Sequence, residues 1–526
     1  PGLAQPGLGE GWIAAKSPSF TVYGNAEPAR VAEITASLER FRAVFAQLSP
    51  ALELQSPAPT KILAFRDAKA YAPYKTSPDR GSSRILGQFL SHPDGNYITL
   101  DAGTQLVSSF TVIYHEYVHY FVRHNFPGIP LWFNEGLAEY YSTFATDGES
   151  AHVGLPVERH VRWLRRNGEL ALDQVLATEQ SVSGHDGHQV GRFYAVSWAL
   201  VHYLMSGDSE RLDRAIDFLV RLRTGEAAED AFERAFDVRV GTLEQELASY
   251  IAAGELPSAS IPLSRLPSAP VKVHELPPED ALFHLGDLLA HMGREHAAEQ
   301  HFQLALDHWG DHPESHAGLA FVRDLQSRFE EAEWFYQDAL RLGSRDPLTY
   351  LLFGRHLLAR TSGSPLDERN ELASRARVQL DRAVALNADY GEAWALLGRS
   401  HLVGSKDPEA GLKATQRARL LMPERADVVD AEARLLLNLE RFDEAEALIE
   451  DVLAFLAPAE AVEQARSAVA RQRLIHASIQ AFEREDVESG LAYFDQAISA
   501  TSDPEQRERM EVQLREMQER WRASGS

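Results

Sequence analysis

The feature that most constrains the fold is a pattern of apolar and small residues that returns every 34 positions in the second half of the chain. One copy comprises Leu282, Leu285, Gly286, Ala298, Phe302 and Ala305, and the next comprises His316, Leu319, Ala320, Ala332, Tyr336 and Ala339. A repeat of this length is typical of a helix pair that can bury its apolar face only against neighbouring pairs. Small side chains stand where two helices must cross closely. The pattern therefore predicts a stack of helix pairs.

Further copies of the pattern continue toward the C-terminus. They begin with Tyr350, Trp394, Val429 and, in degenerate form, Leu474. A polar segment over 505–521 is suited to cap the end of the stack. These residues resemble the tetratricopeptide repeat, and the resemblance implies an all-α solenoid whose groove binds a protein partner.

Prolines mark the boundary that the sequence suggests between this stack and the first half. Six of them lie between Glu255 and Asp280, namely Pro257, Pro262, Pro267, Pro270, Pro277 and Pro278. Such a composition cannot hold a helix and favours an extended path. We therefore predict a first domain over 1–255, a proline-rich linker over 256–278 and the repeat solenoid over 279–526.

The first domain alternates short β-rich runs with helical ones. Strands are predicted over 20–23 and 61–65, a helix over 28–48, and a hairpin from 84–90 and 97–100. From Asp101 onward helical periodicity dominates, with helices over 105–124, 131–144, 157–166, 193–205 and 212–222. This order predicts an α+β domain in which a small sheet is followed by helices.

Composition excludes several classes of protein and of site. The 52 basic and 77 acidic residues give a formal charge of −25, which would repel a phosphate backbone, so we expect no nucleic acid partner. No run of about 18 apolar residues occurs, so we expect no transmembrane span. Cysteine is absent, and any metal must therefore be bound by His and carboxylate side chains. The chain begins at Pro1 without a leader, which predicts a mature or trimmed form.

The sequence His-Glu-Tyr-Val-His at 115–119 is the strongest candidate for chemistry. Residues four apart on a helix lie one turn above the other on the same face, so His115 and His119 could bind one zinc ion. Glu116 lies beside that face, where it could deprotonate the attacking water. The alternative is a helix surface with ordinary histidines.

A second segment, at 132–140, supplies the carboxylates that a zinc site needs. Catalytic zinc takes three protein ligands and keeps one open position, and two His with one Glu is a known set. Glu135 follows His119 by sixteen positions, and Glu139 lies one helical turn beyond Glu135. One carboxylate could therefore bind the metal while the other accepts the remaining N–H of a ligating imidazole.

Together these segments resemble the gluzincin metallopeptidases, the thermolysin and zinc aminopeptidase clan. The resemblance implies a thermolysin-like α+β catalytic domain with one Zn²⁺ per chain. Its ligands would be His115, His119 and Glu135, with Glu116 as general base and acid. Glu139 would be the carboxylate that supports a ligating His from behind.

Two further segments take roles from this resemblance. The run 194–200 is similar to an aminopeptidase stretch whose leading Tyr stabilises the oxyanion, which assigns that role to Tyr194; a core residue is the alternative. The strand with Gly87, Gln88 and Phe89 precedes the zinc helix, where gluzincins place an edge strand that pairs with substrate, and Gly87 would allow close approach. An ordinary interior strand is equally consistent. The loop with His185 and His188 is expected to be solvated and is the second candidate oxyanion donor.

We therefore expect a zinc metallopeptidase whose repeats recruit a protein substrate or partner. The chain lacks the Gly-x-Met-Glu-Asn strand with which aminopeptidases capture the substrate amino terminus, which favours an endopeptidase. One alternative is a catalytically inactive peptidase-like scaffold that acts through its repeats, and another is a metal hydrolase with a non-peptide substrate. The whole chain resembles bacterial peptidase-MA-like proteins with C-terminal tetratricopeptide repeats, which implies a periplasmic or secreted location, with the cytoplasm as the alternative.

Overall fold

The chain forms two compact units, Pro1–Leu352 and Phe353–Ser526. The structure is a computed structural model that describes residues 11–48, 54, 57–76, 87–103, 106–125, 129–168, 170–178, 187–205, 209–223, 226, 228–253, 256–267, 269–501 and 503–524. Within these ranges, no helix is both long and apolar enough to cross a membrane.

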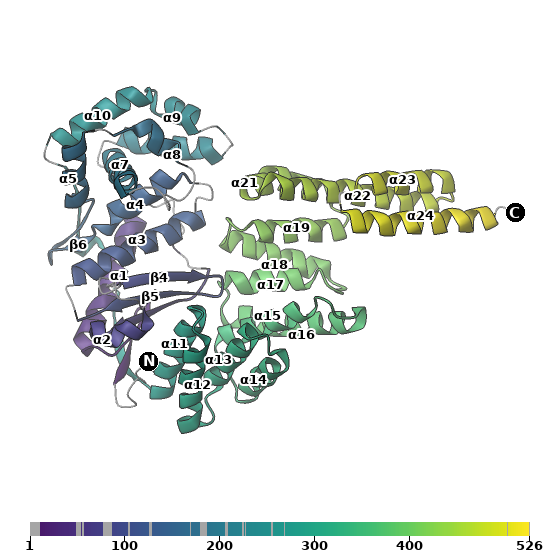
Figure 1. The fold of residues 1–526 in the computed structure, drawn as a ribbon, viewed down its shortest axis with the longest axis horizontal. Helices are drawn as coiled ribbons and strands as arrows, with labels where there is room; N and C mark the ends of the chain where they lie inside the picture. Colours follow the sequence, from purple (N-terminus) through teal and green to yellow (C-terminus); the bar gives the residue numbers. More distant parts are fainter. Residues whose placement is uncertain are drawn as a thin grey trace. The chain divides into compact units, whose positions relative to one another are not determined.

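The first unit contains a six-stranded sheet and a three-stranded sheet (Figure 1). The strands are β1 (Trp12–Lys16), β2 (Thr21–Gly24), β3 (Thr60–Phe65), β4 (Gly87–His92), β5 (Gly95–Asp101), β6 (Ala145–Thr146), β7 (Ser150–Val153), β8 (Ala259–Pro262) and β9 (Lys272–Leu276). The larger sheet has the order β4-β5-β3-β2-β1-β9, with parallel pairing of β5 with β3 and of β3 with β2, and antiparallel pairing elsewhere. The smaller sheet has the order β6-β7-β8.

The helices of the first unit follow the predicted pattern closely. They are α1 (Pro28–Leu48), α2 (Ala68–Tyr71), the 3₁₀ turn η1 (Ala72–Tyr74), α3 (Leu106–Asn125), α4 (Leu131–Ser142), α5 (Glu158–Asn167), α6 (Leu172–Leu176), α7 (Gly187–Met205), α8 (Ser209–Arg223), α9 (Ala228–Phe236), α10 (Val240–Ala252), the 3₁₀ turn η3 (Leu263–Arg265), α11 (Pro278–His291), α12 (Glu295–Trp309), α13 (Pro313–Leu325) and α14 (Phe329–Arg341). The helix expected over 28–48 is α1 itself, and the five later predicted helices overlap α3, α4, α5, α7 and α8.

One face of the six-stranded sheet packs against α1 and α3. Successive residues of a strand point to opposite faces, so Ile62 and Ala64 of β3 share a face with Ile98 and Leu100 of β5. All four are buried in a single apolar core together with residues of α1, α3, α4 and α7. This core fixes the position of α3, which carries the His-Glu-Tyr-Val-His motif.

The opposite face of the sheet is covered by the first repeat. The ring of Tyr23 stacks on His284 of α11 at 3.9 Å between centroids. Lys61 Nζ lies 2.6 Å from Asp287 Oδ2, and the Tyr97 hydroxyl donates a hydrogen bond of 2.8 Å to the same oxygen. Sheet and repeat are therefore joined by buried polar groups as well as by ring packing.

The segment 256–278, predicted as a linker, is part of both sheets. It does follow an extended path, but β8 pairs with β7, and β9 pairs with β1 from Lys272 to Leu276. Pro262 ends one strand, and the other prolines lie outside the strands, where a missing N–H removes no ladder hydrogen bond. The segment therefore does not separate two compact units, since the first unit continues to Leu352.

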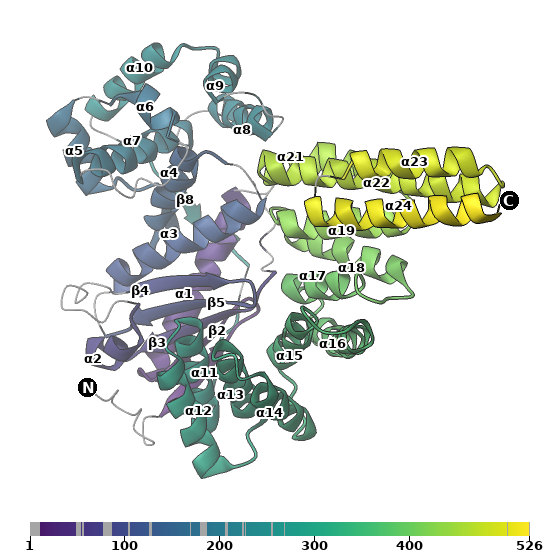
Figure 2. The same cartoon turned by 45° about the vertical axis from the view of Figure 1, so that its right-hand side comes forward.

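The repeats are helix pairs, as the 34-residue pattern predicts. After α14 they continue as α15 (Pro347–Arg360), α16 (Leu366–Leu386), α17 (Gly391–Ser400), α18 (Pro408–Leu421), α19 (Ala426–Asn438), α20 (Phe442–Leu448), the π-helical turn η4 (Ile449–Leu453), α21 (Ala454–Leu456), α22 (Ala459–Glu483), α23 (Val487–Ser499) and α24 (Pro504–Ser524). A Cβ on Gly286 or Gly318 would lie 2.6 or 2.4 Å from the ring of Phe302. Close helix approach thus explains the small residues of the pattern. Figure 2 shows α22, α23 and α24 packed side by side in the second unit.

Candidate metal centre

The site is built from two consecutive helices, α3 and α4. Ile113, Tyr117 and Val118 of α3 are buried in the core, which leaves His115 and His119 on the other side of the helix, partly exposed. Helix α4 begins at Leu131, directly after Pro130, and runs beside α3. Its first turns therefore bring Glu135 next to the two imidazoles.

Three ligand atoms converge as the sequence predicts. His115 Nε2 and His119 Nε2 lie 3.0 Å apart, and Glu135 Oε2 lies 3.5 and 3.4 Å from them. Ligands about 2.0–2.1 Å from a tetrahedral zinc ion lie about 3.3–3.4 Å from one another. Among the described residues these three form the group of His and carboxylate side chains that could hold a metal ion.

A cation also accounts for two otherwise unfavourable features of these residues. Glu135 Oε2 is buried and makes no hydrogen bond, although buried polar atoms are normally paired. His119 Nδ1 lies 2.9 Å from Asn134 Oδ1, so the ring N–H donates there and the Nε2 lone pair faces His115. The donor set and its spacing therefore fit zinc.

The neighbouring groups shift the pKa values of Glu135 and His119. Burial raises the pKa of Glu135, but the two imidazoles facing it lower that pKa to about 2. Burial lowers the pKa of His119, and the nearby Glu135 carboxylate outweighs this effect and raises it overall. Glu135 is therefore an anion across the ordinary pH range, as a metal ligand must be.

Tyr194, at the start of the apolar part of α7, lies within the electrostatic reach of the site. Burial raises its pKa to about 12, and the carboxylates of Glu135, Glu139 and Glu116 contribute to the rise. The phenol is therefore protonated at neutral pH, and its O–H can donate a hydrogen bond. It is only half-buried, unlike Ala195 and Val196, which follow it in the core.

Glu139 is buried in α4, but its contacts differ from those predicted. It pairs with Arg159 at 2.5 Å and with His160 Nε2 at 3.4 Å, both on α5. Burial raises its pKa, and His160, Arg159 and His115 together lower it overall. The N–H of His119, which Glu139 was one candidate to accept, goes to Asn134 instead. No local spacing pointed to Arg159 and His160, because a separate helix supplies them.

Helix α4 can approach α7 closely because residue 136 is glycine. A Cβ there would lie 2.3 Å from the backbone oxygen of Ser197. Gly136 directly follows Glu135, and Ser197 lies one turn after Tyr194. The glycine therefore allows the helix with the third ligand and the helix with the phenol to lie against each other.

The predicted substrate strand is β4, and it is an edge strand. Within the described sheet it pairs only with β5. The Gln88 side-chain amide donates a hydrogen bond of 2.8 Å to the backbone oxygen of Tyr74 and accepts one of 2.9 Å from the backbone N–H of Thr76. This side chain is therefore already engaged within the protein. Phe89 packs on Tyr120 with centroids 6.0 Å apart, and Gly87 is buried. Of these three residues, Gly87 has no side chain and Gln88 is already engaged, so their backbone groups are what they can offer a substrate.

The two His residues of the loop before α7 differ in what the structure describes. His188 is exposed and packs on the ring of Trp163 at 5.2 Å, near the N-terminus of α7. His185 lies outside the described residues. The ring contact of His188 is therefore with α5.

Comparison with known proteins finds similarity to solved structures of repeat proteins. No family model matches the chain, and no curated protein matches it. A thermophilic TPR protein from Thermus thermophilus is 22% identical and covers 37% of this chain and 99% of its own, with a TM-score of 0.27. YrrB, a TPR protein with an unusual peptide-binding site, is 19% identical over 36% of this chain and 92% of its own, with a TM-score of 0.31. PilF of Pseudomonas aeruginosa is 17% identical over 45% and 97%, also with a TM-score of 0.31. Because these scores are low, the repeat architecture rests on the helix pairs themselves.

Proposed function

We propose that the chain is a zinc-dependent metallopeptidase. The observation that carries the proposal is the convergence of His115 Nε2, His119 Nε2 and Glu135 Oε2 within 3.0 to 3.5 Å of one another. A zinc ion held there would act as a Lewis acid that polarises the scissile carbonyl and activates water.

The chain's own residues divide the remaining work. Glu116 follows His115 directly, so its carboxylate can take a proton from the attacking water and return it to the leaving amine. Tyr194 can donate a hydrogen bond to the oxyanion without adding charge. Asn134 holds His119 in the tautomer whose lone pair faces the metal position.

A peptide is the favoured substrate because β4 is an edge strand in the part of the sheet that the structure describes. An extended chain can add to such an edge through main-chain hydrogen bonds, which do not require a particular side chain. The Gln88 side chain is already engaged with Tyr74 and Thr76, so binding at this strand would depend on backbone groups. This mode of binding suits an endopeptidase.

The test combines a metal assay with two variants. Wild-type protein should contain one zinc ion per chain by elemental analysis and cleave peptides from a mixed library. Glu116→Gln should keep the zinc and lose cleavage, because it retains the shape of the side chain without the base. Glu135→Gln should lose zinc and cleavage together. Full turnover by Glu116→Gln would contradict the mechanism, and wild-type protein without zinc after metal loading would contradict the site.

A second candidate is a scaffold that acts through its repeats, and the extent of the repeats favours it. Helix pairs make up the chain from α11 to α23, and helix-pair repeats characteristically bind partners along their concave surface. The Glu116→Gln variant separates the two functions. A biological effect that survives in this variant supports the scaffold, whereas an effect that is lost with cleavage supports the peptidase.

A further inference from the structure

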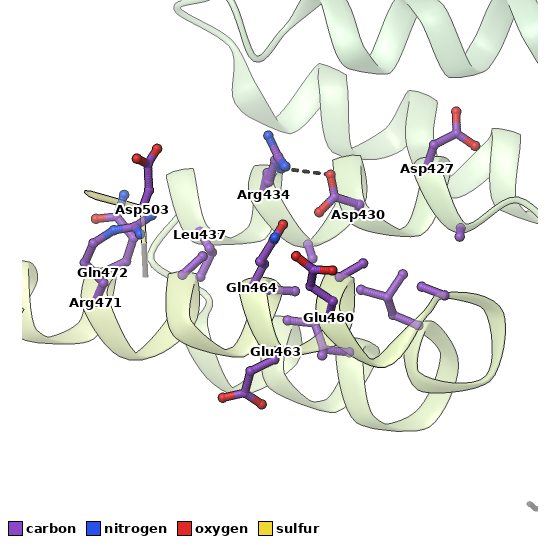
Figure 3. Close-up of a pocket in the computed structure, with 18 of the residues that line it drawn as sticks. Asp427, Asp430, Arg434, Leu437, Glu460, Glu463, Gln464, Arg471, Gln472 and Asp503 are labelled. Carbon is purple, nitrogen blue, oxygen red and sulfur yellow. Dashed lines mark ion pairs between the residues drawn. The ribbon is translucent and has the colours of Figure 1, made fainter. Parts of the chain in front are cut away.

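The fifth and sixth copies of the repeat enclose a groove in the second unit. Its volume is about 1200 Å³, and it is lined by α19, η4, the first half of α22 and the start of α24 (Figure 3). Small-molecule pockets typically have volumes of about 300–1,000 Å³. The size of this groove therefore favours a segment of polypeptide.

The groove exists because α22 is much longer than its partner. Helix α22 has 25 residues and α23 has 13, and they are joined by a short turn. Ser478 near the end of α22 donates a hydrogen bond of 2.7 Å to the Gly490 oxygen of α23. The first half of α22, over 459–472, therefore extends beyond α23 and faces α19 and η4 instead.

The π-helical turn η4 shapes the base of the groove. It contains one residue more per hydrogen-bonded turn than an α-helix, and such turns often occur at functional sites. Ile449 and Leu453, at its two ends, are buried and line the groove together with Leu437 of α19. The base is therefore apolar.

The wall formed by α22 leaves space for side chains of another molecule. Its lining residues include Ala461, Ala465 and Ala468, which lie at helical spacing on one face. Ala461 is exposed and Ala465 is buried, so the face passes from solvent into the groove. Because Ala465 packs in one apolar cluster with Ile449 and Leu453, apolar side chains of a ligand would enter beside Ala461 and Ala468.

The rim of the groove carries net negative charge. Four carboxylates line it, belonging to Asp427, Asp430, Glu460 and Asp503, against the guanidiniums of Arg434 and Arg471. Arg434 is paired with Asp430 at 2.8 Å, and the charge of Asp503 acts on Arg471. The two cations of the lining are thus each matched by a carboxylate within it.

Glu460 is the acidic group best placed to meet a ligand. Figure 3 shows its carboxylate directed from α22 toward α19, whereas Glu463 lies on the other side of α22. Asp427 is held by Arg425 at 2.7 Å. The chain as a whole carries a formal charge of −25, which adds a long-range attraction for cationic partners.

We propose that this groove binds a segment of a partner protein in which Lys or Arg residues stand beside apolar ones. Apolar side chains would fill the space above Leu437, Ile449 and Leu453, and a cationic side chain would pair with Glu460. The proposal rests on the partner-binding role proposed for the repeats and is independent of zinc and of peptide cleavage.

The test measures binding of labelled peptides to the full-length protein by fluorescence anisotropy, in the presence of a chelator. Three peptides of equal length are compared, composed of Leu and Lys, of Leu and Glu, and of Ser and Lys. We expect the Leu and Lys peptide to bind most tightly, and its affinity to fall as salt is added. Equal binding of the Leu and Glu peptide would overturn the proposal, as would no binding of the Leu and Lys peptide.

Variants locate the binding to the groove. Ala461→Trp fills the groove from an exposed position and should abolish binding, with an unchanged melting temperature. Glu460→Lys should weaken binding by about fivefold or more, the scale of losing an exposed charge pair. Glu483→Lys makes the same charge change at an exposed site at the far end of α22 and should leave affinity unchanged. Unchanged binding to Ala461→Trp would overturn the assignment.

Sedimentation velocity tests the other possible occupant, a second copy of the chain. We expect the wild-type protein and Ala461→Trp to sediment alike. Self-association that Ala461→Trp abolishes would assign the groove to a contact between copies and overturn the proposal. Because no arm of these experiments depends on hydrolysis, loss of the peptidase assignment would leave this inference standing, and its failure would leave the peptidase assignment standing.

Discussion

Replacing Asp287 by asparagine should strongly destabilise the first unit. Asp287 on α11 receives the Lys61 ammonium at 2.6 Å and the Tyr97 hydroxyl at 2.8 Å, and the side chains of Lys61 and Asp287 are only 15% and 4% exposed. Burial lowers the pKa of Lys61, but Asp287 outweighs this effect and raises it overall, so Lys61 is charged in the folded state. Asp287→Asn retains the shape of the side chain and leaves that charge without its counter-ion.

Removing one partner of a buried ion pair costs about 3–5 kcal/mol, whereas replacing both partners by apolar residues is often neutral or stabilising. Lys61→Met combined with Asp287→Leu should therefore recover part of the loss, because Tyr97 and His291 still lose their contacts with Asp287. Glu33→Gln, which breaks an exposed pair with Arg30 on α1, is the control and should cost at most about 1 kcal/mol.

The assay is urea unfolding followed by hydrogen exchange of peptides that cover β3 and α11, so that the first unit is measured separately from the second. A chelator is added because bound metal would stabilise the native state. If Asp287→Asn unfolds at the same urea concentration as Glu33→Gln, or if the double variant is no more stable than Asp287→Asn, the repeat is not held on the sheet by this ion pair.

Three further predictions concern helices α4 and α7 and the same junction. Gly136→Ala should destabilise the first unit by about 1–3 kcal/mol and weaken zinc binding, because the new Cβ would clash with the backbone of Ser197. Gly241→Ala in α10, where the space is open, is the control and should leave the melting temperature measured by calorimetry unchanged. Tyr194→Phe should lower kcat by about 10²- to 10³-fold with unchanged zinc content, and full activity would remove the oxyanion role. His291 bridges Asp287 and Asp94. Burial lowers the pKa of His291, but the two carboxylates outweigh this effect and raise the pKa to about 9. The contribution of His291 to stability is therefore complete below its unfolded pKa of about 6.5 and is lost as pH rises through 9. The difference in urea midpoint between wild type and His291→Gln should accordingly shrink between those pH values, and a constant difference would contradict the charged state of His291.

The elements that could be predicted are those encoded by residues close together in the sequence or by a recurring pattern. The helix over 28–48 has a 3.6-residue apolar period, and α1 has the same bounds. His115 and His119 are placed on one face by helix geometry alone, and Glu135 reaches them because α4 packs beside α3. Gly286 was identifiable because the pattern recurs, and it lies against Phe302; Gly318, which is not part of the pattern, lies against the same ring.

The features that sequence could not supply depend on contacts between distant segments. Arg159 and His160 reach Glu139 from α5, about one helix and two strands later in the chain, and no spacing encodes that contact. The histidines of the first repeats are spread over two helices and a turn, a spacing that predicts solvated surface for His296, His301, His308, His312 and His316. His301, His312 and His316 are nevertheless buried, and His301 lies 3.1 Å from the Tyr74 hydroxyl. The burial of His301 follows from the sheet that the repeat covers, which the repeat pattern alone does not reveal.

The position of the proline-rich segment in the sheet also determines which variants can test the role of the repeats. Its many prolines indicate only that the segment is not an α-helix. An edge strand is as compatible with such a composition as a linker is, because β9 forms ladder hydrogen bonds on only one side. Cutting the chain at 278 would remove α11 and uncover the face of the sheet that carries Tyr23, Lys61 and Tyr97. Lys61 would then lose Asp287, and β5 would lose its contacts with His291. A truncated protein without activity would therefore not show that the repeats recruit substrate, and point variants such as Ala461→Trp, which leave this junction intact, are the appropriate probes of that role.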